Sequence, residues 1–133
     1  MIVSFEERLR SLQLARGWAH PLTIAEMLDG WRAFIEQCEA AYEWGFYEYE
    51  NDLSIRDRIA LILAAADISN HAVVQNMAEQ VAQLDRRFRS LLQEGVSIKG
   101  TEKPWWRRGV LTYSGAEYAN DVSSLYSVAV EIR

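Results

Sequence analysis

The chain has 133 residues, of which half are hydrophobic and a quarter are charged, and its formal net charge is −5. This balance is typical of one globular domain and excludes a disordered chain. The negative charge argues against general binding to nucleic acid or to an anionic membrane, because both need a positive protein surface.

Cysteine usage and the first residues of the chain predict a cytoplasmic protein. Cys38 is the single cysteine, so the chain cannot form an internal disulfide of the kind that staples small secreted domains. Charged residues interrupt positions 1–10, where a signal peptide needs an apolar stretch. The longest apolar run, residues 59–66, is far shorter than the roughly 20 residues of a membrane span. We therefore expect no membrane partner.

Two amphipathic helices are predicted in the first third of the chain. The first covers residues 4–16 and ends at Gly17. The second begins at a Thr-x-x-Glu capping box formed by Thr23 and Glu26. Its apolar stripe at helical spacing comprises Ile24, Met27, Leu28, Trp31, Ile35, Cys38 and Tyr42. Gly30 inside this helix predicts close approach by another backbone, because glycine otherwise costs roughly 1 kcal/mol there.

Two further helices are predicted in the middle of the chain. Ser54 and Asp57 resemble an N-terminal cap for a helix that is apolar on every side, which we expect to be the most buried element. The next helix begins at Ser69 or Asn70 and ends before Gly95. Its apolar residues alternate in spacings of three and four, the seam pattern of a helix that packs along its neighbours: Val74, Met77, Val81, Leu84, Phe88 and Leu91.

The last third of the chain predicts an irregular loop, a helix and a short terminal element. No helical period is visible at about 96–113, where glycines and a proline interrupt the chain. A helix follows Ser114, and its inward face comprises Tyr118, Val122, Leu125 and Tyr126. Alternating apolar residues at 128–132 could form a short C-terminal strand, and a continued helix is the alternative for the last residues. The predicted fold class of residues 1–133 is therefore a single all-α domain, a bundle of four to five helices.

The patterns for metal binding and catalysis are incomplete. Glu36-x-x-Glu39 resembles half of the carboxylate pattern of the all-α nucleotide pyrophosphohydrolases of the MazG type, in which Glu-x-x-Asp on the next helix completes the site. Here the next helix offers Asp57 and Asp67 but no glutamate. Cys38 lies on an apolar helix face, and no serine has the setting of a nucleophile. We therefore predict no metal, no cofactor and no catalytic residue, and we favour a protein that is not an enzyme.

A basic aromatic stretch, residues 99–108, lies inside the predicted loop. The stretch contains four cationic residues and one glutamate, and Trp105 and Trp106 are followed directly by Arg107 and Arg108. These four residues could clamp a carboxylate or phosphate of a small ligand, or stack on bases while neutralising phosphates. In the opposing interpretation, the tryptophans close one end of the bundle and the arginines pair with acidic neighbours.

The strongest surface candidate is the acidic aromatic segment, residues 42–52. It holds five aromatic and four acidic residues, with Gly45 to bend it. No single helical face can bury all five aromatic side chains, and exposed aromatics ringed by negative charge suit a basic protein partner. The predicted partner-binding residues are Glu43, Trp44, Phe46, Tyr47, Glu48, Tyr49, Glu50 and Asp52. In the opposing interpretation, the segment extends a helix beneath the loop and its glutamates pair with Arg107 and Arg108.

Three functional hypotheses follow. The first is a small binding protein, immunity- or antitoxin-like, that engages a basic partner through residues 42–52. In size, charge and residue type the chain is similar to the helical colicin immunity proteins. The second is a helical protein that binds or hydrolyses a small ligand or nucleotide in a pocket near residues 105–108. The third is a structural subunit that forms a homodimer through the seam of its fourth helix.

Overall fold

The computed structural model describes residues 3–133, which are mostly helical. The α-helices are Phe5–Ala15 (α1), Ile24–Glu39 (α2), Phe46–Asp52 (α3), Ser54–Ala64 (α4), Ala72–Arg89 (α5) and Ala116–Tyr126 (α6). A 3-10 turn covers Trp105–Arg107 (η1), and two short strands cover Tyr113–Ser114 (β1) and Glu131–Ile132 (β2). The predicted all-α fold is confirmed. Leu53 alone separates α3 from α4 and itself has helical backbone angles, so these two elements are nearly one helix.

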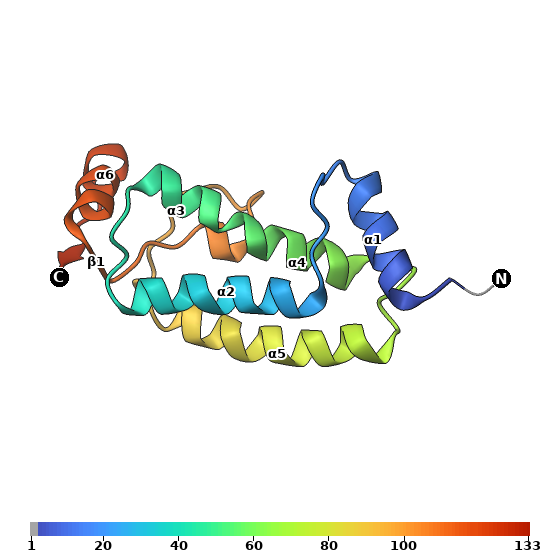
Figure 1. Ribbon diagram of the computed structural model, residues 1–133. Helices are drawn as coiled ribbons and strands as arrows, with labels where there is room; N and C mark the ends of the chain where they lie inside the picture. Colours follow the sequence, from blue (N-terminus) through green and yellow to red (C-terminus); the bar gives the residue numbers. More distant parts are fainter. Residues whose placement is uncertain (1–2) are drawn as a thin grey trace.

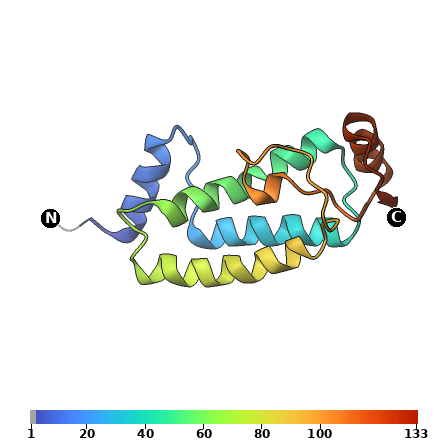
Figure 2. The same cartoon turned by 180° about the vertical axis from the view of Figure 1, so that it is seen from behind.

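Three helices form the body of the molecule. α2 contacts both α4 and α5, and α4 also contacts α5. α4 runs antiparallel to the other two, and α1 and α6 lie at opposite ends of this body (Figure 1). Seen from behind, the irregular segment between α5 and α6 runs along the side of α3 and α4 (Figure 2). No helix within residues 3–133 combines the length and the apolar character needed to cross a membrane.

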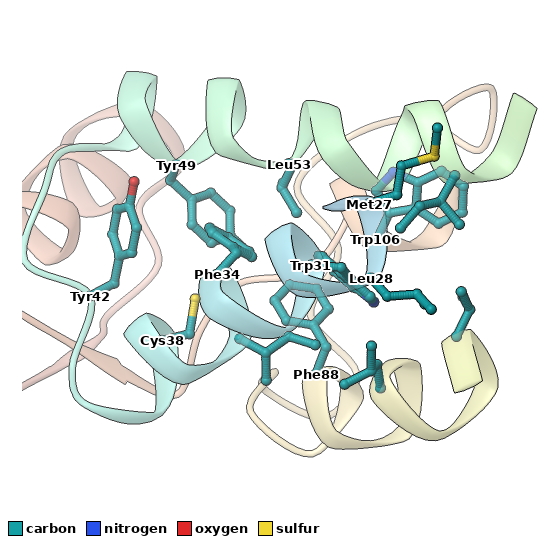
Figure 3. Packing of buried hydrophobic residues seen from close by; sticks show 14 of the residues in the cluster. Met27, Leu28, Trp31, Phe34, Cys38, Tyr42, Tyr49, Leu53, Phe88 and Trp106 are labelled. Atoms are coloured by element: carbon teal, nitrogen blue, oxygen red, sulfur yellow. The ribbon is translucent and has the colours of Figure 1, made fainter. Parts of the chain in front are cut away.

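α2 carries more buried residues than any other helix of the described chain, namely Met27, Leu28, Trp31, Phe34, Ile35 and Cys38. Rings of Trp31 and Phe34 stack at 5.8 Å, and Phe88 of α5 lies 5.1 Å from Trp31 (Figure 3). The prediction that the helix beginning at Ser54 would be the most buried is wrong. Only Arg56, Ile59 and Ile62 of α4 are buried, and its other apolar residues are half-buried or exposed.

The capping box predicted for α2 is confirmed. The Glu26 N–H donates to Thr23 Oγ1 at 3.1 Å, and the Thr23 N–H donates to Glu26 Oε1 at 2.9 Å. Gly30 does lie against another helix, but its close neighbour is a side chain and not a backbone. A Cβ on Gly30 would lie 3.1 Å from Ile55 Cγ1 of α4. A side chain at position 30 would therefore require the Ile55 side chain to shift by a few tenths of an ångström.

The caps predicted for α4 and α5 are wrong. Ser54 caps nothing, because α3 runs on through Leu53 into α4 and no side-chain cap is present. The cap of α5 is His71 instead of residues 69–70, and its Nδ1 accepts a hydrogen bond from the Val73 N–H at 3.2 Å. In both places the path of the chain into the helix decides the cap, and the type of one residue does not describe that path.

The seam of α5 is buried as predicted at Val74, Met77, Val81, Leu84 and Phe88, whereas the sixth predicted residue, Leu91, lies beyond the end of the helix and is half-buried. It packs against α2 and α4 of the same chain. The homodimer hypothesis rested on this seam. Since one chain already covers it, the seam offers little apolar surface to a second copy.

The C-terminal elements close the end of the body beside α3. Tyr118, Ala119 and Val122 are the buried residues of α6. Leu125, which we expected to face inward, is 54% exposed, because Ala119 completes the buried face and rotates it away from Leu125. β2 pairs in parallel with β1, so the last residues, for which the sequence left helix and strand open, form a short strand. Its partner is the end of the irregular loop.

Candidate functional site

The acidic aromatic segment forms the turn after α2 together with α3. Ala41 adopts a left-handed conformation with φ of 73°, which turns the chain out of α2. The Gly115 N–H then donates to the Tyr42 carbonyl oxygen at 2.8 Å. A Cβ on Gly115 would lie 3.0 Å from that oxygen, so the absence of a side chain allows this approach. The start of α6 is thereby attached to the backbone of the segment.

The five aromatic side chains of the segment divide into an inner and an outer set. The inner set is almost fully buried and comprises Tyr42, Phe46 and Tyr49. The outer set consists of Trp44, which is 51% exposed, and Tyr47, which is 79% exposed. Helical period explains the division within α3, because positions three apart share a face while their intermediate neighbours turn away from it. Only the outer set can reach a partner.

The inner set belongs to a buried aromatic cluster that also contains Tyr118 of α6. The rings of Tyr49 and Tyr118 lie 4.8 Å apart, and the Tyr42 hydroxyl donates to Asp52 Oδ2 at 2.7 Å. Burial is the main cause that raises the pKa of the Tyr49 and Tyr118 hydroxyls and of the nearby Cys38 thiol. These groups therefore stay protonated and are not nucleophiles near neutral pH. Figure 3 shows Tyr42, Tyr49 and Cys38 within this part of the core.

The four acidic residues of the segment also divide. Glu50 faces the irregular loop, where its carboxylate forms an ion pair with Lys99 and lies 3.7 Å from Arg107 Nη1. Asp52 is half-buried and accepts the hydrogen bond described above. Glu43 and Glu48 are exposed and belong to no ion pair among residues 3–133. The expectation of a solvent-facing surface therefore describes Glu43 and Glu48, and the expectation of pairing with the loop describes Glu50.

Two carboxylates of α6 join the exposed part of the segment. A Cβ on Gly45 would lie 2.8 Å from Asp121 Oδ2, 2.9 Å from Glu48 Oε2 and 3.0 Å from Glu117 Oε1. Three carboxylates thus converge at the start of α3, where Asp121 also accepts the Phe46 N–H at 3.0 Å. None of the ion pairs between described residues involves these three groups.

We call this region the α3–α6 acidic surface, and it comprises Glu43, Trp44, Tyr47, Glu48, Glu117 and Asp121. Sequence reasoning missed Glu117 and Asp121 because they lie some 70 positions after the segment. Their spacing of four places both on one face of a helix, which was the available signal. That signal alone does not say which element the face meets.

The basic aromatic loop is fastened to the core by Trp106 and Arg107. Trp106 is 8% exposed, and its Nε1–H donates to Asp57 Oδ1 at 2.8 Å. Arg107 donates to the same carboxylate through Nε and Nη2. The guanidinium of Arg56 lies 4.1 Å from the centre of the Trp106 ring. Asp57 therefore anchors the loop, a role different from the helix cap predicted for it.

This anchoring continues into the body of the molecule. Arg56 is buried and donates to both oxygens of Asp85, at 3.0 and 2.9 Å. The Trp31 Nε1–H donates to the same carboxylate at 3.1 Å. A chain of polar contacts thus runs from the centre of α2 through α5 and α4 to the loop. Buried polar groups that are hydrogen-bonded in this way hold one arrangement of neighbouring elements.

The four predicted ligand residues of the loop lie in different settings. Trp106 and Arg107 both donate hydrogen bonds to Asp57, as described above. Trp105 and Arg108 are half-buried and line a surface hollow of about 520 Å³. Arg108 forms no ion pair with any described carboxylate. We expected acidic neighbours to form ion pairs with both Arg107 and Arg108, and of these two only Arg107 does so within residues 3–133.

The carboxylates that suggested a metal site are also separated. Glu39 forms an ion pair with Arg87 at 2.7 Å, and the hydrogen bond that Arg87 donates to Glu39 raises the pKa of Arg87. Glu36 is exposed on the same helix. Among residues 3–133, no group of three or more His, Cys, Asp or Glu side chains could hold a metal ion.

The fold and this surface define a class: a small all-α protein with one acidic face that carries exposed aromatic side chains. No family model matches the chain, and neither a curated protein nor a solved structure matches it. The residues of the chain itself are therefore the basis for a functional proposal.

Proposed function

We propose that this chain is a small protein-binding domain that captures a basic protein partner through the α3–α6 acidic surface. The observation that carries the proposal is the exposure of Trp44 and Tyr47 beside four carboxylates without a cationic partner in residues 3–133. Trp and Tyr are enriched among the few residues whose truncation costs most binding free energy at protein interfaces. The carboxylates around them set the sign of the partner's charge.

The convergence of Glu48, Glu117 and Asp121 strengthens the choice of a basic partner. Three like charges around Gly45 repel one another, because each oxygen lies close to the same point. A lysine or arginine of a partner placed there would replace this repulsion with attraction. The long-range negative field would also raise the rate of association with a cationic protein and make that rate sensitive to salt.

A nuclease is one class of protein with the required surface, because it must hold an anionic substrate. An immunity- or antitoxin-like role in the cytoplasm is therefore the form of the proposal that we favour. The first partner to test is a basic protein encoded by a gene that neighbours the gene of this chain.

The test compares capture of that basic protein by the wild type and by surface variants. We expect Tyr47→Ala and Glu117→Lys each to weaken binding by about 10-fold or more, as measured by isothermal titration calorimetry. Leu14→Ala is the matched control, because Leu14 is 48% exposed on α1 and lies outside the acidic surface. Raising the salt concentration should weaken wild-type binding.

Two results would contradict the proposal. One is unchanged binding in both Tyr47→Ala and Glu117→Lys. The other is equal weakening in Leu14→Ala, which would show that the effect is not confined to this surface. Circular dichroism of each variant separates loss of binding from loss of folding.

A further inference from the structure

A second surface feature lies at the C-terminal end of α5. The open hollow of about 520 Å³ is bordered by the end of this helix, by the residues that follow it and by the start and the far side of η1. Its polar and aromatic lining comprises Arg89, Ser90, Gln93, Glu94, Ser97, Trp105 and Arg108. Its volume falls in the range of pockets that hold small molecules, about 300–1,000 Å³.

Two arginines line this hollow, and neither has a carboxylate partner among residues 3–133. Arg56, Arg87 and Arg107 by contrast pair with Asp or Glu side chains at hydrogen-bond distance. Arg89 and Arg108 are absent from every ion pair of the described chain. Both therefore keep donors free for an external anion.

The positions of the two guanidinium groups are restricted by their surroundings. Arg89 lies over the Trp105 ring, with its guanidinium carbon 3.8 Å from the ring centre. Trp105 is in turn held by Trp106 at 5.8 Å and by Phe88 at 6.2 Å. The Nε of Arg108 is buried and has no hydrogen-bond partner. Since this Nε is shielded from solvent, the Nη groups of Arg108 are the donors that remain for an anion in the hollow.

The walls of the hollow are also held in place. A Cβ on Gly109 would lie 2.7 Å from Leu92 Cδ1, so the glycine lets Leu92 pack against the loop. Leu92 forms an isolated antiparallel bridge with Leu111, and the Ile98 N–H donates to the Arg108 carbonyl oxygen at 2.9 Å. These contacts join the end of α5 to both arms of the loop.

Two features of the hollow limit the charge of its ligand. Glu94 also lines it, and the end of α5 carries the negative end of the helix dipole. Both oppose a polyanion such as nucleic acid. A single carboxylate or phosphate group that reached both Arg89 and Arg108 would gain two charge-assisted contacts, and apolar Leu92 and Val96 border the remaining space.

We propose that this hollow binds a small molecule that carries one oxyanion group, held by Arg89 and Arg108. The site is independent of the α3–α6 acidic surface. It also differs from the pocket expected from residues 105–108, since Trp106 and Arg107 are not part of it and Arg89 is.

The test titrates the wild-type protein with inorganic phosphate in one series and sodium acetate in another, with sodium chloride of equal ionic strength as reference. The readout is the nuclear magnetic resonance signal of each arginine Nε–H group. We expect saturable shifts of the Arg89 and Arg108 signals in at least one series, and the stronger series distinguishes a phosphate from a carboxylate ligand. Arg89→Gln should weaken the affinity by about 10-fold or more, since one charge-assisted contact is lost.

Arg86→Gln is the matched control, because Arg86 lies in the same last turn of α5 but does not line the hollow. Arg108→Lys keeps the charge and removes the planar fork, so it should also weaken binding. Arg89 is exposed, so Arg89→Gln keeps the test valid even if Arg108→Lys fails to fold. The proposal is overturned if neither anion gives a saturable shift beyond that of chloride, or if Arg86→Gln weakens binding as much as Arg89→Gln.

Discussion

The acidic segment at 42–52 and the basic loop at 99–108 have similar aromatic content and opposite charge, yet the fold uses them differently. In the helical segment, the period of α3 turns Tyr49 into the core and Tyr47 out to solvent. In the irregular loop no period exists, and individual contacts decide which side chain is used. Trp106 is held by Asp57, whereas its neighbour Trp105 remains at a surface hollow. In a helix, spacing therefore determines which side chains are buried and which are exposed. In an irregular loop, the individual contact partners determine it.

The two regions meet at Glu50, which pairs with Lys99 and lies near Arg107. The other acidic residues of the segment, Glu43, Glu48 and Asp52, form no ion pair with the loop. Glu43 and Glu48 are exposed together with carboxylates of α6, so opposite charge alone did not bring the regions into full contact. The following predictions test this division between residues that support the fold and residues that remain free.

The largest effect is expected from alkaline pH, because it acts on several buried groups of the segment at once. Burial raises the folded-state pKa of Tyr42, Tyr49, Tyr118 and Cys38 above their ordinary values. Their contribution to stability is therefore complete below the ordinary pKa values, about 8.5 for cysteine and about 10 for tyrosine, and is lost as pH rises above them.

The measurement for this prediction follows phenolate absorbance and circular dichroism in one alkaline titration. Phenolate from the buried tyrosines should form only as the helical signal is lost. Ionisation of all six tyrosines of the chain with the helical signal intact would contradict the assigned burial.

The next largest effect is expected from Trp106→Ala in the loop. It should reduce the free energy of unfolding by about 3–5 kcal/mol, because it empties a buried aromatic site and removes a donor from Asp57. Trp44→Ala is the matched substitution in the segment and should change stability by less than about 0.5 kcal/mol, since Trp44 is 51% exposed. Urea unfolding of both variants measures the difference. Equal losses would mean that Trp44 also supports the fold.

A smaller difference is expected between the two adjacent arginines of the loop. Arg107→Gln should cost about 1–2 kcal/mol, because it breaks a largely shielded pair with Asp57 and a bond to the Glu50 carbonyl oxygen. Arg108→Gln should cost less in the absence of anions, because Arg108 has no carboxylate partner in the described chain. Thermal unfolding in a chloride buffer compares them. A greater loss in Arg108→Gln would show that its packing, and not an external anion, accounts for its place at the hollow.

The sequence by itself determined the features that depend on neighbours within one or two helical turns. The all-α class, the capping box at Thr23 and the buried seam of α5 were predicted correctly. Each follows from spacing along a single helix, which local geometry sets without reference to the rest of the chain. The same reasoning identified aromatic and acidic residues at 42–52, although it could not divide them.

Only the tertiary structure decided which of these residues meet. Gly45 and Asp121 come together because α6 docks on the start of α3, and Asp57 meets Arg107 because the loop lies against α4. Contacts between residues so far apart depend on how whole elements pack, and periodicity carries no information about that packing. For the same reason the sequence showed two regions of opposite charge, while packing joined them at Glu50 and left the α3–α6 acidic surface facing solvent.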